Sequence, residues 1–426
     1  MHRMTHPPRQ VTGGTHSDAK IHVTGGVDSH SEVHVAAAVC TLSHRLLGVA
    51  KFATTSAGYV QLLVWLRSFG LLDAVGIEGT GSYAAGLTRY LTGEDVVVFE
   101  VDRPDRKARR QHGKSDPVDA EAAARAVLSG RATGTPKSRE GIIEAIRVLQ
   151  VVYRSAVKDR TAANNQFSAA VISAPAQIRE EVEQIPDRQR IARVHRWRER
   201  SGDNLTDQAT RQALRELAWR SNLLSEQAAR VEAELDVLTE QAAPALRDLV
   251  GVGVHTAAQL LITFGGNTER ITSEAAFAHL CGAAPIPASS GKTTRHRLNR
   301  GGDRAANSAL WRIVMARRLY DPRTRAYVER RRAEGLSDRE ITRCLKRYVA
   351  RDIYRALTRP APLAPRGKQL RQLRLAAGLP QRVVAKQFDI PVKRLSRIET
   401  GITRDPETQT RIHAWLTQHH TTQHAA

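Results

Sequence analysis

Short apolar runs alternate with polar turns through the first third of the chain, a pattern that predicts a sheet interleaved with helices. Five runs have the length and the β-branched content of strands. They lie at 21–27, 32–41, 46–52, 74–78 and 96–101. Apolar residues spaced three or four apart predict helices at 56–69, 82–91 and 116–128. Three strands followed by helix, strand, helix, strand and helix is the order of a ribonuclease H-like α/β fold, so we expect one domain over 21–135.

Residues 140–245 carry a helical pattern almost throughout, and one stretch repeats buried-type positions in alternating steps of three and four. These positions are Leu214, Leu217, Ser221, Leu224, Ala228, Val231, Leu235 and Leu238. The repeat predicts a coiled-coil seam, but a heptad does not identify the helix that fills it. The seam belongs either to a helical hairpin within the chain or to a surface for self-association.

A run of arginines precedes this seam. It contains Arg188, Arg190, Arg193, Arg196, Arg198 and Arg200. On one helix these side chains would form a basic face that could follow a phosphate backbone.

Two further units are expected after the helical region. Residues 246–357 form an α-rich unit, three prolines near 360–365 mark a linker, and 366–418 form a small all-α domain. The first 20 residues are polar and His-rich, so 1–20 are expected to be a disordered terminus without a signal sequence.

Charge narrows the class of partner. Lys and Arg outnumber Asp and Glu by 65 to 43, which gives a formal charge of +22. An excess of this size favours a nucleic-acid partner, because neutralised phosphates release counterions. Three widely spaced cysteines argue against a disulfide framework or a Cys-rich zinc site. No apolar run is long enough to cross a membrane, and we expect a cytoplasmic, nucleoid-associated protein.

Carboxylates stand at the ends of two strands and on one helix of the first domain. Asp28 follows the first strand, Glu78 ends the fourth, and Asp116 and Asp119 share a helix face because they are three residues apart. Hard oxygen ligands converging on a sheet edge suit divalent metal ions that promote phosphodiester displacement. Glu100 and Asp102, at the end of the fifth strand, are rival candidates, and Lys114 could contact a scissile phosphate.

These acidic segments resemble a known family. The run Gly113-Lys114-Ser115-Asp116-Pro117-Val118-Asp119-Ala120 is similar to the signature of the DEDD transposases of the insertion-sequence one-ten family. Val27-Asp28 and Glu78-Gly79-Thr80-Gly81-Ser82-Tyr83 match the other two acidic motifs of that family. The resemblance implies a RuvC-like domain in which Asp28, Glu78, Asp116 and Asp119 hold Mg²⁺.

The unit at 246–357 is similar to the C-terminal domain of the same family. Val250-Gly251-Val252-Gly253 resembles a helix-hairpin-helix turn, whose backbone N–H groups can hold a phosphate. Ser289-Ser290-Gly291 precedes a segment, 292–332, with 13 Lys or Arg against 3 Asp or Glu. The resemblance implies that Ser290 is a nucleophile, with Ser289 as the alternative. The basic residues expected to hold the phosphate are Lys292, Arg295, Arg297, Arg300 and Arg304.

The family resemblance also implies partners and an assembly. Members of the family exchange DNA strands as homo-tetramers with a site composed of both domains, guided by an element-encoded bridge RNA. The residues themselves indicate only a surface that would accept a polyanion.

Residues 366–401 resemble a Cro/repressor-type helix-turn-helix. The second helix is expected at 381–388 and the recognition helix at 391–399. The candidate DNA contacts are Gln381, Lys393, Arg394 and Arg397.

These patterns together predict a DNA transposase or recombinase that uses a metal site and a serine–DNA intermediate. Two alternatives remain: a hydrolytic RuvC-like junction nuclease, which needs no serine, and a non-enzymatic helix-turn-helix regulator, in which the carboxylates are dispensable.

Overall fold

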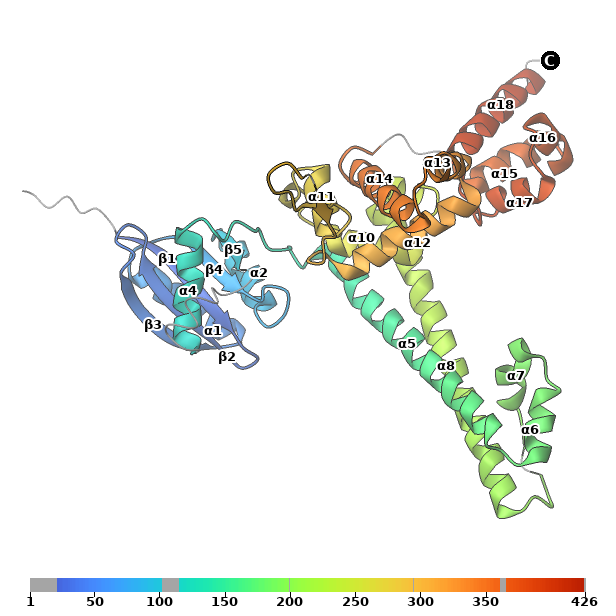
Figure 1. Cartoon of the computed structure of the whole chain (residues 1–426), viewed down its shortest axis with the longest axis horizontal. Helices are drawn as coiled ribbons and strands as arrows, with labels where there is room; N and C mark the ends of the chain where they lie inside the picture. The colour runs from blue at the N-terminus through green and yellow to red at the C-terminus, as the bar shows by residue number, and fades with distance from the viewer. Residues whose placement is uncertain (1–20, 102–114, 199, 294, 361–364, 425–426) are drawn as a thin grey trace, which may run out of the picture. The chain divides into compact units, whose positions relative to one another are not determined.

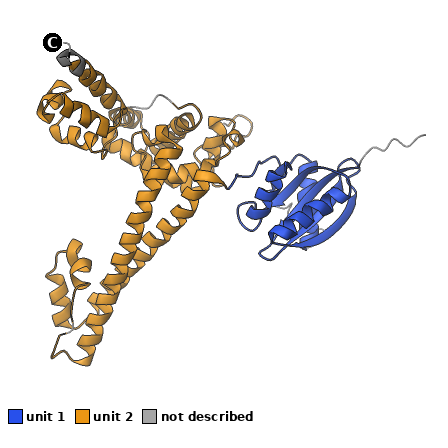
Figure 2. Ribbon diagram, turned by 180° about the vertical axis from the view of Figure 1, so that it is seen from behind, with its two compact units in different colours: residues 1–139 blue, residues 140–426 orange. Residues whose placement is uncertain are grey.

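The computed structural model describes residues 21–101, 115–198, 200–293, 295–360 and 365–424. The expected disordered terminus, 1–20, lies outside these ranges. The chain divides into two compact units, residues 1–139 and 140–426 (Figure 2). Among the described helices, none combines the length and the apolar character needed to cross a bilayer.

The first unit is a five-stranded mixed sheet with the order β3-β2-β1-β4-β5 (Figure 1). Its strands are β1 (His22–Ser29), β2 (Val33–Cys40), β3 (Leu46–Ala53), β4 (Leu71–Glu78) and β5 (Val98–Val101). The first three strands pair antiparallel, and β4 runs parallel to both β1 and β5. This confirms the expected ribonuclease H-like order of elements.

Helices cover both faces of this sheet. On one face, α1 (Ser56–Ser68) and α2 (Ala85–Gly93) pack on the side chains of β1 and β4 that include Val27 and Ile77. On the other face lies α4 (Asp116–Leu128), whose Ala120 packs against Val35 and Ala37 of β2. Side chains alternate between the two faces along each strand, so the faces occupied by Val27 and Ile77 fix the orientation of their neighbours.

The second unit begins with two long helices, α5 (Gly141–Ile172) and α8 (Leu205–Ala242), which lie side by side and antiparallel (Figure 1). Ile146, near the start of α5, packs with Leu235 near the end of α8, and Phe167 packs with Leu214 at the opposite ends. Halfway along, Ser221 Oγ donates a hydrogen bond to Asn164 Oδ1 at 2.6 Å. The heptad seam therefore belongs to a helical hairpin within the chain.

A helical core and a small terminal domain complete the second unit. The core elements are α9 (Pro244–Arg247), α10 (Val254–Phe264), α11 (Glu274–Leu280), α12 (Arg304–Tyr320), α13 (Pro322–Ala333) and α14 (Asp338–Thr358). The terminal domain consists of α15 (Gly367–Ala376), α16 (Gln381–Gln387), α17 (Val392–Glu399) and α18 (Pro406–His424). Its own buried cluster includes Leu370, Val384 and Leu395, so the domain has a separate apolar core.

Candidate active site

Two glycines let α4 approach the sheet closely. A Cβ on Gly26 of β1 would lie 2.1 Å from the Ala120 carbonyl oxygen, and one on Gly76 of β4 would lie 2.6 Å from the Ala123 carbonyl oxygen. Such distances are far below van der Waals contact, so any larger residue would force the helix away. The close approach brings the first turn of α4 over the ends of β1 and β4.

The start of α4 supplies two of the predicted carboxylates. Ser115 is extended, with φ −149° and ψ 149°, and Pro117 occupies a first-turn position, where its missing N–H costs no hydrogen bond. Asp116 and Asp119 both lie in the first turn, where the positive end of the helix dipole favours negative charge. Asp119 is 5% exposed.

Asp28 and Asp116 meet at this position together with a histidine that the sequence analysis missed. His30 Nε2 lies 3.2 Å from Asp28 Oδ2 and 3.5 Å from Asp116 Oδ1. One ligand atom from each of the three residues lies within 4.8 Å of the other two. The only sequence signal for His30 was its place two residues after Asp28, in the turn that follows β1.

Glu78 reaches the same face from β4. Ile77 pairs with Val27 in the parallel register and packs on the α1 side, so Glu78 points, as Gly76 does, to the α4 side. Ser29 Oγ donates a hydrogen bond to the backbone carbonyl of Glu78 at 2.9 Å, which connects the ends of the two strands. Glu78 and Asp119 nevertheless lie outside the compact group of three donors.

The rival carboxylate Glu100 is not in this arrangement. Glu100 pairs with Ile77 in the register of β5 on β4, so its side chain points to the opposite face from Glu78. Its carboxylate accepts a hydrogen bond from Thr80 Oγ1 at 2.6 Å. Asp102 and Lys114 lie outside the described residues.

The electrostatics of the carboxylate site suit a divalent cation. Burial raises the pKa of Asp28, the imidazole of His30 lowers it, and the nearby carboxylates of Asp119 and Asp116 raise it further, with a net increase. The negative charge of these three acidic groups is thus not fully compensated by His30. Carboxylate oxygens are the hard ligands that divalent metals such as magnesium prefer, so the residues present fit a divalent metal.

Ser290 lies at the tip of a β-hairpin in the second unit. The two-residue strands β6 (Ile286–Pro287) and β7 (His296–Arg297) pair, and Ser290 and Thr293 exchange backbone hydrogen bonds of 3.1 and 3.0 Å. Gly291, with φ +53°, occupies the left-handed conformation required between them.

The two candidate serines differ in their contacts. Ser289 Oγ accepts a hydrogen bond from the Arg295 backbone N–H at 3.1 Å, so this hydroxyl helps to hold the hairpin closed. The Ser290 hydroxyl makes no hydrogen bond with another described residue, and its side chain is exposed. Of the two candidate serines, Ser290 is therefore the one whose hydroxyl takes no part in holding the described hairpin together.

The hairpin and the segment after it present cations without acidic partners. Lys292, Arg295, Arg297, Arg300 and Arg304 are all exposed. Within the described part of the chain, none of them forms an ion pair. Such uncompensated charges on one segment are available to neutralise phosphates.

The Gly-x-Gly segment connects α9 to α10 as expected for a helix-hairpin-helix turn. Gly251 has φ +84°, and a Cβ there would lie 3.0 Å from the Ile313 carbonyl oxygen of α12. Gly253 is the N-cap of α10. Gly251 therefore lets the turn cross closely over α12.

The terminal domain has the helix-turn-helix order. Of its predicted DNA contacts, one belongs to an internal network, two have local polar partners and one has none among the described residues. Gln381 Nε2 donates to Glu399 Oε2 at 2.7 Å, and Glu399 also forms a buried ion pair with Arg374, so Gln381 belongs to an internal network. Arg394 pairs with Asp405 at 2.6 Å, and Arg397 donates to Thr403 Oγ1 at 3.2 Å. Lys393 is exposed and has no such contact with a described residue.

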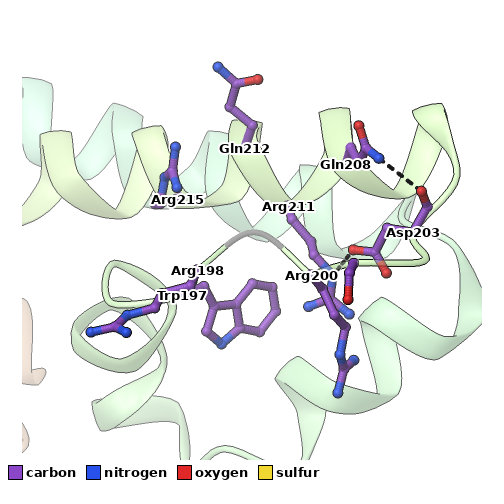
Figure 3. Close-up of a pocket in the computed structure, with 9 residues that line it drawn as sticks. Trp197, Arg198, Arg200, Asp203, Gln208, Arg211, Gln212 and Arg215 are labelled. Carbon is purple, nitrogen blue, oxygen red and sulfur yellow. Dashed lines mark hydrogen bonds and ion pairs between the residues drawn. The ribbon is translucent and has the colours of Figure 1, made fainter.

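The six arginines before the seam do not form one helix face, which corrects that prediction. Among the described residues of this run, the helix α7 (Asp187–Val194) holds the first three arginines alone. Arg190 Nε donates to the Val182 and Ile185 carbonyls at the end of α6 (Ala176–Glu183). Arg198 and Arg200 instead line a pocket of about 480 Å³ beside Trp197 and Arg211 (Figure 3). α7 ends at Val194, which is buried with Leu214 in the apolar cluster at this end of the hairpin, so the later arginines follow the helix and do not extend its face.

Comparisons with known proteins place these features in a class. A family model for DEDD-type transposases, described as "Transposase", matches residues 25–173. A second, described as "Transposase IS116/IS110/IS902 family", matches residues 243–329, and a "Helix-turn-helix domain" model matches residues 367–414. The two matched regions are thus similar to domains of transposases, which are DNA-processing enzymes.

Within that class, the chain has the domain pair of the IS110-family transposases, followed by a helix-turn-helix domain. It is 37% identical over 122 residues to "Insertion element IS110 uncharacterized 43.6 kDa protein" from Streptomyces coelicolor. That alignment spans 28% of this chain and 30% of the relative.

Proposed function

We propose that the protein is an insertion-sequence transposase that cuts and rejoins DNA through a covalent serine–DNA intermediate, assisted by Mg²⁺ at the carboxylate site. The observation that carries the proposal is the meeting of Asp28 and Asp116 above the sheet, with buried Asp119 beside them. A fold must oppose considerable repulsion to bring such carboxylates together, and this cost is expected where they serve chemistry.

The carboxylates of Asp28, Glu78, Asp116 and Asp119 are the groups that would hold the metal. When bound, Mg²⁺ neutralises charge on phosphate oxygens and lowers the pKa of a coordinated hydroxyl or water. His30, between Asp28 and Asp116, would keep these two carboxylates oriented.

Ser290 would carry the covalent step. Its Oγ loses a proton and bonds to the phosphorus, one phosphorus–oxygen ester bond of the DNA breaks, and the departing DNA hydroxyl takes up a proton. In rejoining, a hydroxyl of the new strand loses its proton and attacks the same phosphorus, and Ser290 recovers its hydroxyl. The ester energy is conserved, so no other energy source is required. The cations of the hairpin would balance the charge of the phosphate.

We further propose a guide RNA and a homo-tetramer as partners, on the basis of the family resemblance. The net charge of +22 supports a polyanionic partner, and RNA would satisfy it as well as DNA. Exposed apolar residues on α8, Trp219 and Leu223, support a protein contact outside the hairpin seam.

Trapping of the intermediate tests the proposal. A nicked suicide DNA substrate carrying the element's end is incubated with the protein, and adducts are located by denaturing gel and mass spectrometry. We expect an adduct on Ser290 that is lost in Ser290→Ala, retained in Ser289→Ala, and reduced about a hundredfold or more in Asp116→Asn or Glu78→Gln. Full-rate strand exchange by Ser290→Ala would instead support a hydrolytic nuclease.

A further inference from the structure

A polar pocket of about 490 Å³ lies between α5, α10 and α12 in the second unit. This volume falls within the range of about 300 to 1,000 Å³ that is usual for small-ligand sites. All of its lining residues belong to the described part of the chain, and none of them is acidic. Its chemistry therefore points to a ligand that is polar and negatively charged.

The floor of the pocket is buried and contains an amide without a partner. Gln150 is 4% exposed, and its side-chain carbonyl oxygen accepts no hydrogen bond from any described residue. Gln259, which is also buried, has a partner at both of its side-chain polar atoms, because it accepts from Arg154 and donates to Thr263 Oγ1 at 3.0 Å. A buried acceptor left without a donor costs free energy, so a ligand that brings an N–H or O–H group would be favoured here.

The rim of the pocket carries three cations. Arg154 and Lys158 project from consecutive turns of α5, and Arg312 projects from α12. All three are exposed, and none forms an ion pair with a described residue. Cations at the mouth of the pocket would bind a phosphate there. The hydrogen-bond donor of the same ligand could then enter the pocket and reach the Gln150 amide.

An aromatic pair forms one wall. The rings of Tyr153 and His255 stack with centroids 3.7 Å apart and planes 19° apart, and His255 Nε2 lies 3.0 Å from Glu232 Oε1. Burial lowers the pKa of His255, although Glu232 opposes this shift. The wall is a flat aromatic surface, which suits a planar ligand better than a compact ion.

We propose that this pocket binds a single unpaired nucleotide of a bound nucleic acid. Arg154, Lys158 and Arg312 take the phosphate, and the Gln150 carbonyl accepts from an exocyclic base amine or a 2′-hydroxyl. A nucleotide combines the anion, the planar ring and the donor that the pocket requires. The inference rests on the proposed nucleic-acid substrate but not on the carboxylate site or on Ser290.

Equilibrium binding without metal tests the pocket apart from catalysis. Fluorescence anisotropy of the full-length protein is measured with a fully paired DNA duplex, the same duplex with one bulged nucleotide, and a single-stranded RNA. Gln150→Leu removes the side-chain amide with its orphan acceptor but changes no charge, and Lys158→Gln and Arg312→Gln remove one rim charge each. Arg220→Gln, at an exposed position of α8 outside the pocket, is the matched control.

Each rim variant should bind the bulged DNA or the RNA more weakly and lower the salt slope by about 0.7 to 0.9 relative to wild type. Gln150→Leu should weaken binding about fivefold for the ligand with the unpaired nucleotide and leave the paired duplex unaffected. The probe that responds identifies the source, DNA or RNA. The inference would be overturned if all three pocket variants bound as tightly as Arg220→Gln. It would also be overturned if Gln150→Leu weakened the binding of every probe equally. Retained binding with no Ser290 adduct would instead refute only the proposed recombination chemistry.

Discussion

Asp28 is the residue on which the electrostatics of the carboxylate site converge. Its pKa is raised in the fold, so the deprotonated form is disfavoured relative to the unfolded chain. The contribution of Asp28 to stability is therefore most favourable below the unfolded pKa, near 3.9, and is lost as pH rises through the folded value. At neutral pH without metal, the charged Asp28 destabilises the first unit.

Because the charged Asp28 destabilises the metal-free protein, Asp28→Asn should raise stability without metal and lower the stabilisation that Mg²⁺ provides. In EDTA at pH 7.5, Asp28→Asn should unfold at a higher temperature than the wild type, because it relieves the repulsion. With Mg²⁺ at about a hundred times its Kd, the wild type should gain about 2.7 kcal/mol of unfolding free energy, and the variant should gain little. Calorimetry in both buffers measures the effect. Equal stabilisation of both proteins by Mg²⁺ would show that the ion binds elsewhere.

At the scale of single residues, spacing along the sequence predicted which carboxylates share a face but not which other groups join them. Asp116 and Asp119 followed from the helical period, and Glu78 followed from the strand end. Glu100 was a rival because a strand end does not reveal its register, and register decides the face. His30 could not be predicted, since a turn residue has no periodicity to fix its direction.

At the scale of elements, the position of α4 depends on the absence of side chains at Gly26 and Gly76. Gly26→Ala would place a methyl group against the Ala120 carbonyl, so α4 must shift. Overpacking of this kind costs about 1 to 3 kcal/mol and should also displace Asp116 and Asp119.

We expect Gly26→Ala to lose both unfolding free energy, measured by urea titration, and DNA cleavage. Gly93→Ala at the end of α2 is the matched control, because a Cβ there meets no atom within 4 Å and the backbone is not left-handed. It should change stability by no more than about 1 kcal/mol, in the stabilising direction. Normal cleavage by Gly26→Ala would mean that the approach of α4 does not set the site.

The hairpin of α5 and α8 separates the two interpretations of the heptad seam. Leu235 is fully buried against α5, so Leu235→Ala should cost about 2 to 5 kcal/mol of unfolding free energy. Trp219 is 49% exposed on the outside of α8, so Trp219→Ser should leave the unfolding free energy nearly unchanged.

Self-association should follow the opposite order. Light scattering on nucleic acid should show a smaller assembly for Trp219→Ser, if this face meets another copy. A tetramer that survives Trp219→Ser together with Leu223→Ser would place the contact on another surface. The heptad could not distinguish these cases because its period is the same whichever helix fills the seam.

At the scale of the whole molecule, the sequence predicted the order of the elements better than the long-range contacts that join them. The ribonuclease H-like order of elements followed from local periodicity, which each segment carries by itself. Contacts such as those of Arg366 and Arg404 with Glu240 and Asp248 join residues more than a hundred positions apart, and no local pattern encodes them. The division of 140–426 into finer domains remains a prediction.

The helix-turn-helix domain has an apolar core that is separate from that of the rest of the second unit. Deletion of 366–426 should therefore leave a folded protein, although Glu240 and Asp248 lose Arg366 and Arg404 as partners. Those ion pairs are partly exposed, so their loss should cost no more than about 1 kcal/mol each. DNA affinity for the element's end or promoter should fall, and the difference should shrink at high salt, because exposed cations such as Lys393 are lost. Lys393→Gln in the full chain is the finer test: it should weaken binding less than the deletion and lower the salt slope by about 0.9. If every DNA binds the truncated protein as tightly as the full chain, the domain does not read DNA here, and a protein contact becomes its role.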